Sequence, residues 1–257
     1  MQPLSETVPA GLSDPFAPTH WSVIIAAGES QAAPEIARAA LAQLCQTYWA
    51  PLYGFVRSRG YSVHDAQDLT QGFFAYLIEH KIYARADRGK GKFRSFLLAS
   101  LKNFLRDSRD RDQALKRGGG YDFLSLNEDQ IEDAEALLQT HFASGESNGE
   151  DRLFERSWAE ALVAAGLEHL AAAYRADGKE KLFQELKIFL TGSAEPLPSY
   201  ADLAARLGTV ASTLRSHVTR LRMQYRDALR AEVRRTVETD AEVEGELREL
   251  LRVLTTS

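Results

Sequence analysis

The chain has 257 residues, of which 44% are hydrophobic and 26% charged, with a formal net charge of -5. These values are typical of a globular protein with a sizeable core. The net charge by itself argues against a nucleic-acid partner, but the charges are distributed in blocks. The single cysteine excludes an intrachain disulfide and favours a reducing compartment. No signal peptide and no apolar run near the ~20 residues of a membrane span is visible. We therefore expect a cytoplasmic protein with no membrane partner.

Residues 1–19 contain four prolines, which predicts a flexible N-terminal arm. A first helical domain is predicted over residues 20–117, because apolar residues recur there at three- and four-residue steps. The recurrence is found in three segments, 36–55, 65–80 and 93–111. Cys45 lies on the first of these apolar stripes, so we expect it to be a buried structural thiol.

Two blocks of opposite charge follow each other in the middle of the chain. Residues 85–117 hold eleven basic and four acidic residues, a local balance of +7. Three glycines, 118–120, then break any helix, and residues 122–151 hold nine acidic and no basic residues. Residues 118–151 are therefore predicted to be an acidic flexible linker.

Helical periodicity resumes after the linker and predicts a second helical domain over residues 152–236, followed by a C-terminal helical tail over 237–257. No segment shows the alternation of a β-strand. The predicted fold is therefore all-α, with two helical domains joined by the acidic linker.

Residues 199–225 predict a helix-turn-helix within the second domain. Ser199 and Asp202 form a plausible capping box for a short helix, and Gly208 suits the left-handed turn that ends it. In the longer helix that follows, Leu214 and Val218 share an inward face.

Four polar residues of this longer helix point outwards or flank the outward row, namely Arg215, Ser216, Thr219 and Arg220. Such side chains suit DNA, because arginine can donate two hydrogen bonds to a guanine edge and hydroxyls can reach bases or phosphates. Residues 206–235 hold eight arginines and two acidic residues, a balance of +6. The alternative is an ordinary helical hairpin whose arginines form a solvated face.

Cations and aromatic residues interleave in residues 92–96 and 102–106. This arrangement suits single-stranded nucleic acid, since cations follow the backbone and aromatic faces stack on unpaired bases. Phe93 and Phe104 lie on one apolar face, so we interpret them as core. Phe96 lies off that face, and its role stays open.

Two parts of the chain resemble extracytoplasmic-function sigma factors. Residues 48–111, with DAQDLTQGFF at 65–74 and FRSFLLASLKN at 93–103, are similar to the first conserved domain of that family. Residues 199–222 are similar to its second conserved domain. The segments 19–23 and 242–247 resemble a long subgroup found in planctomycete-like genomes.

The resemblance implies a sigma factor, which binds core RNA polymerase and directs promoter recognition, DNA melting and transcription initiation. It implies that Asp65, Asp68 and Gln71 dock on the clamp coiled coil of the largest polymerase subunit, and we expect both carboxylates in the first turn of their helix. Asn103 matches the position that receives a flipped base of the minus-ten element, between backbone contacts from Lys102 and Arg106.

For the minus-thirty-five element, the resemblance implies that a four-residue row enters the major groove: Arg215, Ser216, Thr219 and Arg220. The chain departs from the family at a few positions. Gln67 and Gly72 stand where glutamates are usual, Phe96 replaces a tryptophan, and Val210 replaces a Ser or Thr helix cap.

Three other functions were weighed on the residues, one of them a pure interaction scaffold whose arginines are only solvated. A helix-turn-helix regulator that acts without polymerase explains 199–225 but not 65–103. An enzyme is disfavoured, because the six histidines show no i, i+4 pair and no phosphate-binding loop or nucleophile motif is present. We expect no catalytic residue, metal or cofactor. The promoter sequence, the activating signal, the oligomeric state and an anti-sigma or other regulatory partner stay open.

Overall fold

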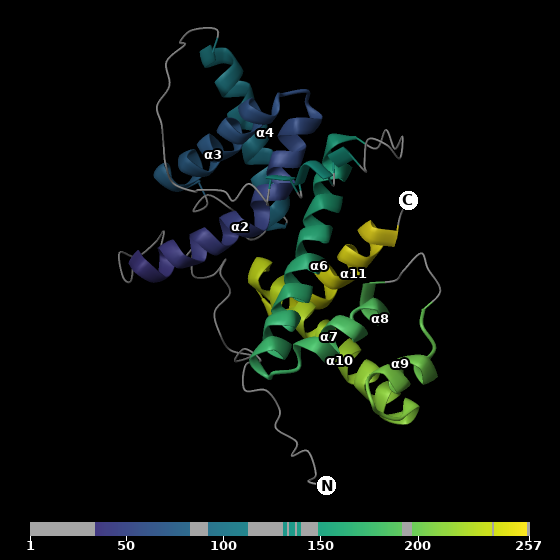
Figure 1. The fold of residues 1–257 in the computed structure, drawn as a ribbon. Helices are drawn as coiled ribbons and strands as arrows, with labels where there is room; N and C mark the ends of the chain where they lie inside the picture. The colour runs from purple at the N-terminus through teal and green to yellow at the C-terminus, as the bar shows by residue number, and fades with distance from the viewer. Residues whose placement is uncertain are drawn as a thin grey trace. The chain divides into compact units, whose positions relative to one another are not determined.

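A computed structural model describes residues 34–82, 92–112, 131–132, 134–136, 138–139, 149–191, 197–237 and 239–255. Within these ranges every regular element is a helix, which confirms the predicted all-α class (Figure 1). The predicted N-terminal arm, residues 1–19, lies outside the described residues.

The chain divides into two compact units. One, the 163–232 unit, contains residues 163–232. The other, the discontinuous unit, contains the described residues up to 162 together with those from 233 onwards. These boundaries differ from those expected from the sequence, which assigns 152–162 to the second domain and 237–257 to a separate tail.

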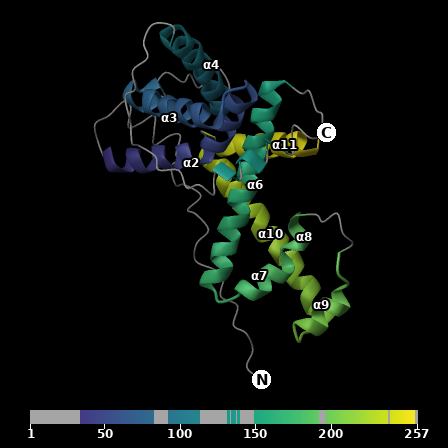
Figure 2. The same cartoon turned by 45° about the horizontal axis from the view of Figure 1, so that its top comes forward.

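The discontinuous unit begins with three helices, α2 (Pro34–Ser58), α3 (Val63–Glu79) and α4 (Phe93–Asp112). It also contains the first part of α6 (Glu150–Ala176) and all of α11 (Asp240–Thr255). Figures 1 and 2 both show α2, α3 and α4 grouped together. The 163–232 unit contains the rest of α6, α7 (Glu180–Leu186), α8 (Ile188–Thr191), α9 (Tyr200–Arg206) and most of α10 (Ala211–Thr236).

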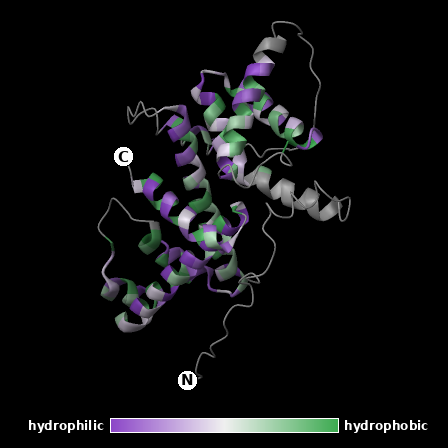
Figure 3. Cartoon of the chain, turned by 180° about the vertical axis from the view of Figure 1, so that it is seen from behind, coloured by the Kyte–Doolittle hydropathy of each residue, from purple (hydrophilic) through white to green (hydrophobic). Residues whose placement is uncertain are grey.

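The predicted apolar faces form the cores. Hydropathy colouring shows hydrophobic and hydrophilic residues alternating around the helices (Figure 3). The core of α2, α3 and α4 includes the fully buried residues Leu52, Phe55, Phe73, Leu77, Leu97 and Leu101. Cys45 is also fully buried, and burial raises the pKa of its thiol to about 12, which confirms the predicted structural role.

The 163–232 unit has a core of its own. Leu203 from α9 and Leu214, Val218 and Leu221 from α10 are buried together with residues of α6, α7 and α8. Phe189 stacks on the partly buried ring of Tyr200, with 5.2 Å between ring centroids. The short α9 is therefore held against the start of α10 by side chains that the sequence places on its inward face.

Arg94 is a buried cation at the centre of the discontinuous unit. Its side chain is 3% exposed, its Nε donates to Glu155 at 2.6 Å, and its Nη1 donates to Glu246. The guanidinium carbon lies 4.0 Å from the ring centroid of Trp158. Burial disfavours the charge, but Glu246 and Glu155 together raise the pKa of Arg94 above its ordinary value.

These contacts explain why the C-terminal helix belongs to this unit. Glu246 lies on α11 and is almost completely buried, and it accepts a second hydrogen bond from Lys92 at 2.9 Å. Figures 1 and 2 both show α11 beside α6. The helix expected as a separate tail therefore supplies a carboxylate to the interior.

The described part of the acidic segment is not a free tether. Residues 131–132, 134–136 and 138–139 are helical, and Ala134 and Leu138 are buried. Glu135 accepts hydrogen bonds from Arg57 Nε at 2.6 Å and from the Tyr53 hydroxyl at 2.5 Å. The prediction of a flexible linker over 118–151 is wrong for these residues, because apolar side chains and one carboxylate anchor them to α2.

Replacing Arg94 with methionine is expected to lower the free energy of unfolding by about 3–5 kcal/mol, because the buried carboxylate of Glu246 loses its guanidinium partner. Chemical denaturation followed by tryptophan fluorescence measures the change, since Trp158 lies against Arg94. Arg252→Met is the matched control, because Arg252 is exposed on α11. An Arg94→Met protein with the midpoint of the control would contradict a structural role for this cation.

Candidate nucleic-acid interface

A short helix, a glycine turn and a longer helix occur where the sequence predicts them. The Ser199 hydroxyl oxygen accepts from the Asp202 backbone N–H at 3.1 Å, and the hydroxyl donates to the Asp202 carboxylate at 2.6 Å. Ser199 is therefore the N-cap of α9, as the capping pattern predicts. Leu203 is fully buried, and Leu207 is partly buried.

Gly208 allows the chain to turn between the two helices. Its φ is +63°, and the N–H groups of Gly208 and Thr209 donate to the carbonyls of Ala205 and Ala204 at 3.4 and 3.0 Å. These two bonds define a Schellman turn, which needs a left-handed residue at this position. Val210 follows as the N-cap of α10, with its carbonyl accepting from Leu214 N–H at 3.1 Å and its side chain 60% exposed.

The outward row of α10 has the predicted orientation. Arg215, Ser216, Thr219 and Arg220 are all exposed, while Leu214, Val218 and Leu221 of the same helix are buried in the core. The hydroxyls of Ser216 and Thr219 donate to helix carbonyls four residues earlier, at 3.2 and 3.0 Å, which leaves their oxygen lone pairs available as acceptors.

The arginines of this region fall into two groups. Arg206 pairs with Glu185 at 2.8 Å, and Arg222 donates to the Phe189 carbonyl from two nitrogens at 3.4 Å each. Arg215 and Arg220 form no ion pair with any carboxylate in the described part of the chain. The guanidinium of Arg215 lies 5.7 Å from the ring centroid of Tyr200. Some of the eight arginines counted in the +6 balance of residues 206–235 therefore already have partners within the fold.

The basic block of the first domain is also partly used by the fold. Lys92 and Arg94 pair with Glu246, so neither is a free cation. Lys102 pairs with Asp151 at 2.5 Å and lies 5.6 Å from the ring centroid of Phe55. Arg85, Arg88, Lys90, Lys116 and Arg117 lie outside the described residues.

The three predicted minus-ten residues lie near the middle of α4. Asn103 is exposed between Lys102 and Arg106, and Arg106 is exposed with a 3.8 Å contact to Asp107. Phe96 is partly buried, with its ring centroid 6.1 Å from that of Phe93. The aromatic whose role was left open therefore packs in part against a neighbour on its own helix.

The three α3 residues predicted to contact the polymerase clamp differ in their exposure and in their hydrogen bonds. The Asp65 carboxylate accepts from the Ser62 hydroxyl at 2.7 Å, while Asp65 N–H donates back to Ser62, so Asp65 helps to cap the helix. Asp68 is exposed and lies 3.6 Å from His64 Nδ1. The helix begins at Val63, so Asp68 is outside the first turn and only Asp65 is inside it. Gln71 is partly buried.

Comparisons with protein-family models, with curated proteins and with solved structures found no match of any kind. Among the residues that the structure describes, no helix is long and apolar enough to cross a membrane. No group of three or more His, Cys, Asp or Glu residues in those same ranges is arranged to hold a metal ion.

Gly208→Ala is expected to lower the free energy of unfolding by about 1–2 kcal/mol, because a Cβ disfavours the left-handed backbone. Apart from its chain neighbours, no atom of the described residues lies within 4 Å of the Cβ position, so the effect comes from the backbone alone. Gly245→Ala in α11 is the matched control: its site is equally open and helical, so it should gain about 0.5–1 kcal/mol. Denaturation followed by circular dichroism measures both, and equal shifts would refute the turn assignment.

Proposed function

We propose that the chain is a sigma factor of the extracytoplasmic-function type. It binds core RNA polymerase and directs promoter recognition, DNA melting and transcription initiation. The observation that supports this most directly is the exposed row of α10 directly after a glycine turn, with two arginines that lack an ion pair among the described residues. The resemblance of 48–111 to the first sigma domain supports the polymerase-bound role over plain DNA binding.

In this proposal α10 enters the major groove at the minus-thirty-five element. Arg215 and Arg220 can each donate two hydrogen bonds to a guanine, because no described carboxylate competes for them. Ser216 and Thr219 can accept a hydrogen bond from a base amino group through their free lone pairs, and each can donate to a phosphate only by releasing its helix carbonyl. The buried face, which includes Leu214, fixes the direction of the row.

In the same proposal, the middle of α4 contacts the minus-ten element. Asn103 offers one acceptor and two donors for the edge of an unstacked base, and Arg106 contacts phosphate. Lys102 must exchange Asp151 for a phosphate when the strand binds. The ion pair is partly exposed, with side chains 36% and 63% accessible, so its strength is modest and the exchange costs little.

On α3, Asp68 is the best candidate for an electrostatic contact with the polymerase clamp. Asp65 already accepts from Ser62, so a substitution there also weakens the helix start. Asp68 has no such capping role, which makes it the cleaner position for a test of docking.

The proposal is tested by transcription in vitro on a promoter library, with core polymerase in the presence and absence of the chain. We expect transcripts that depend on the chain and share upstream elements. Binding to duplex promoter without binding to polymerase would instead support a helix-turn-helix regulator, and binding to neither would exclude both functions.

Asp68→Lys is expected to weaken binding to core polymerase at least about tenfold, because the charge that faces the clamp is reversed. Glu79→Lys is the control, since Glu79 is exposed at the other end of α3, roughly 16 Å along the axis. Fluorescence anisotropy of labelled chain measures both affinities. Equal affinities of the two variants would remove the clamp assignment.

Asn103→Ala is expected to leave the closed complex nearly intact and to reduce the open complex, because a base pocket contributes only after the duplex opens. Permanganate reactivity of thymines near the start site measures opening, and a pre-melted template should restore activity. Arg106→Ala should instead weaken binding on both templates and lower the salt slope by about one. Wild-type permanganate reactivity in Asn103→Ala would exclude a base contact.

A further inference from the structure

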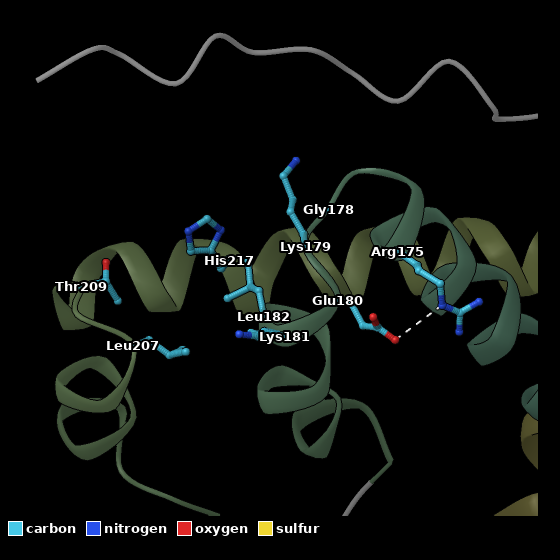
Figure 4. Close-up of a pocket in the computed structure, with 9 residues that line it drawn as sticks. All are labelled: Arg175, Gly178, Lys179, Glu180, Lys181, Leu182, Leu207, Thr209 and His217. Atoms are coloured by element: carbon cyan, nitrogen blue, oxygen red, sulfur yellow. Dashed lines mark hydrogen bonds and ion pairs between the residues drawn. The ribbon is translucent and has the colours of Figure 1, made fainter.

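An open pocket lies beside the start of α10 in the 163–232 unit. It is bounded by the turn between α6 and α7, by the turn after α9, and by α10 itself. Figure 4 shows that Thr209, His217 and Lys179 project towards the same side. These polar groups come from three different elements, and no sequence pattern predicts that they lie together.

The charges around the pocket leave this side positive. Glu180 is turned towards Arg175, with 3.5 Å between Glu180 Oε1 and Arg175 Nε. In Figure 4 both side chains lie to the right of Lys179. Lys181 also lines the pocket and has no ion pair with a described residue. Asp177 lies 3.1 Å from Lys179, in a pair whose side chains are 55% and 37% exposed and which an anion can therefore replace.

The positive charge around the pocket changes the pKa of His217. Burial lowers the pKa of His217 below its ordinary value, and the positive charges of Arg220 and Lys179 lower it further. His217 and Arg220 are three residues apart, which places them about 60° apart around α10. The pocket therefore borders the row proposed to contact bases, on the flank of the helix, where a DNA backbone runs beside a helix in the major groove.

We propose that this pocket binds a phosphate of the DNA backbone that borders the groove occupied by α10, with Lys179, His217 and Thr209 as donors. The inference rests on the proposed function and adds a contact that fixes the register of α10 on the duplex. Lys179 supplies charge, the Thr209 hydroxyl supplies a neutral hydrogen bond, and His217 supplies a second charge when protonated.

The proposal predicts a pH dependence with a definite sign. In the free chain the pKa of His217 is lowered, and a phosphodiester at hydrogen-bond distance raises it. Binding is then coupled to proton uptake between the two pKa values, so affinity for duplex rises as pH falls through that interval. The affinity changes at most tenfold per pH unit, since one proton is involved.

The test measures the affinity of the full chain for promoter duplex at low, constant ionic strength between pH 5.5 and 8. We expect the wild type to bind severalfold more tightly at the acidic end and His217→Asn to lose this dependence. His80→Asn is the control, since His80 is exposed at the end of α3 in the other unit, and it should keep the wild-type profile.

A second measurement follows the His217 ring by NMR. Duplex should raise the pKa of His217, and Lys179→Gln should raise it in the free chain by removing a positive neighbour. Lys179→Gln should also lower the salt slope of duplex binding by about one. Lys187→Gln, an exposed lysine of the same unit outside the pocket, should leave the His217 pKa unchanged.

Each remaining result overturns the inference in a different way. Duplex binding with an unshifted His217 and identical pH profiles in wild type and His217→Asn would exclude the phosphate contact and leave the sigma-factor proposal intact. A response of His217 to inorganic phosphate but not to duplex would make the pocket a site for free anions. A chain that binds no duplex, alone or with core polymerase, would overturn the proposed function and this inference together.

Discussion

The guanidinium of Arg94 lies inside the discontinuous unit, where a cation is tolerated only if carboxylates and a ring face replace its water. Glu155 on α6 and Glu246 on α11 supply the carboxylates, and Glu246 is 152 residues away in sequence. Trp158 covers the guanidinium face at 4.0 Å. Because one charge on α4 needs partners from two other helices, the arrangement of those helices in this unit is coupled to a single side chain, and the C-terminal helix becomes part of the interior.

Charge pairing within the fold also determines which cations remain available to a binding partner. Residues 131–151 are strongly acidic, and three of their described carboxylates pair with cations of the first helices and of the turn after α2: Glu135 with Arg57, Glu150 with Arg59 and Asp151 with Lys102. The negative net charge is therefore not spread evenly over the surface. Much of it compensates positive charges of the first helices. A nucleic-acid strand bound at Lys102 would have to displace one exposed carboxylate, whereas the pair of Arg94 with Glu246 is too deeply buried to exchange.

Local features were predictable from the sequence because they depend on neighbours within one helical turn. The Ser199 cap, the left-handed Gly208 and the inward face of Leu214 all follow from spacings of four residues or fewer. The partners of Arg94 were not predictable, since no local pattern links α4 to a helix near the C-terminus. A count of charges from the sequence does not distinguish cations that pair within the fold from those that do not. The local balances of +7 and +6 therefore overstate the positive charge that is available to a partner. The start of α3 was misplaced because Ser62, rather than a later residue, caps it.

On α10, the ion pairs and hydrogen bonds within the fold leave some arginines exposed to solvent. Arg206 and Arg222 have structural partners, while Arg215 and Arg220 face solvent, and the field of Arg220 and Lys179 adds to burial in lowering the pKa of His217. Positive groups held near one another repel, and the repulsion is relieved by a partner with negative charge. A protein partner with scattered carboxylates would match a few of these groups. A phosphate backbone repeats its charge at regular intervals, so it could match the outward row of α10 and its flank together, and this is why we propose a nucleic acid as the partner of this face.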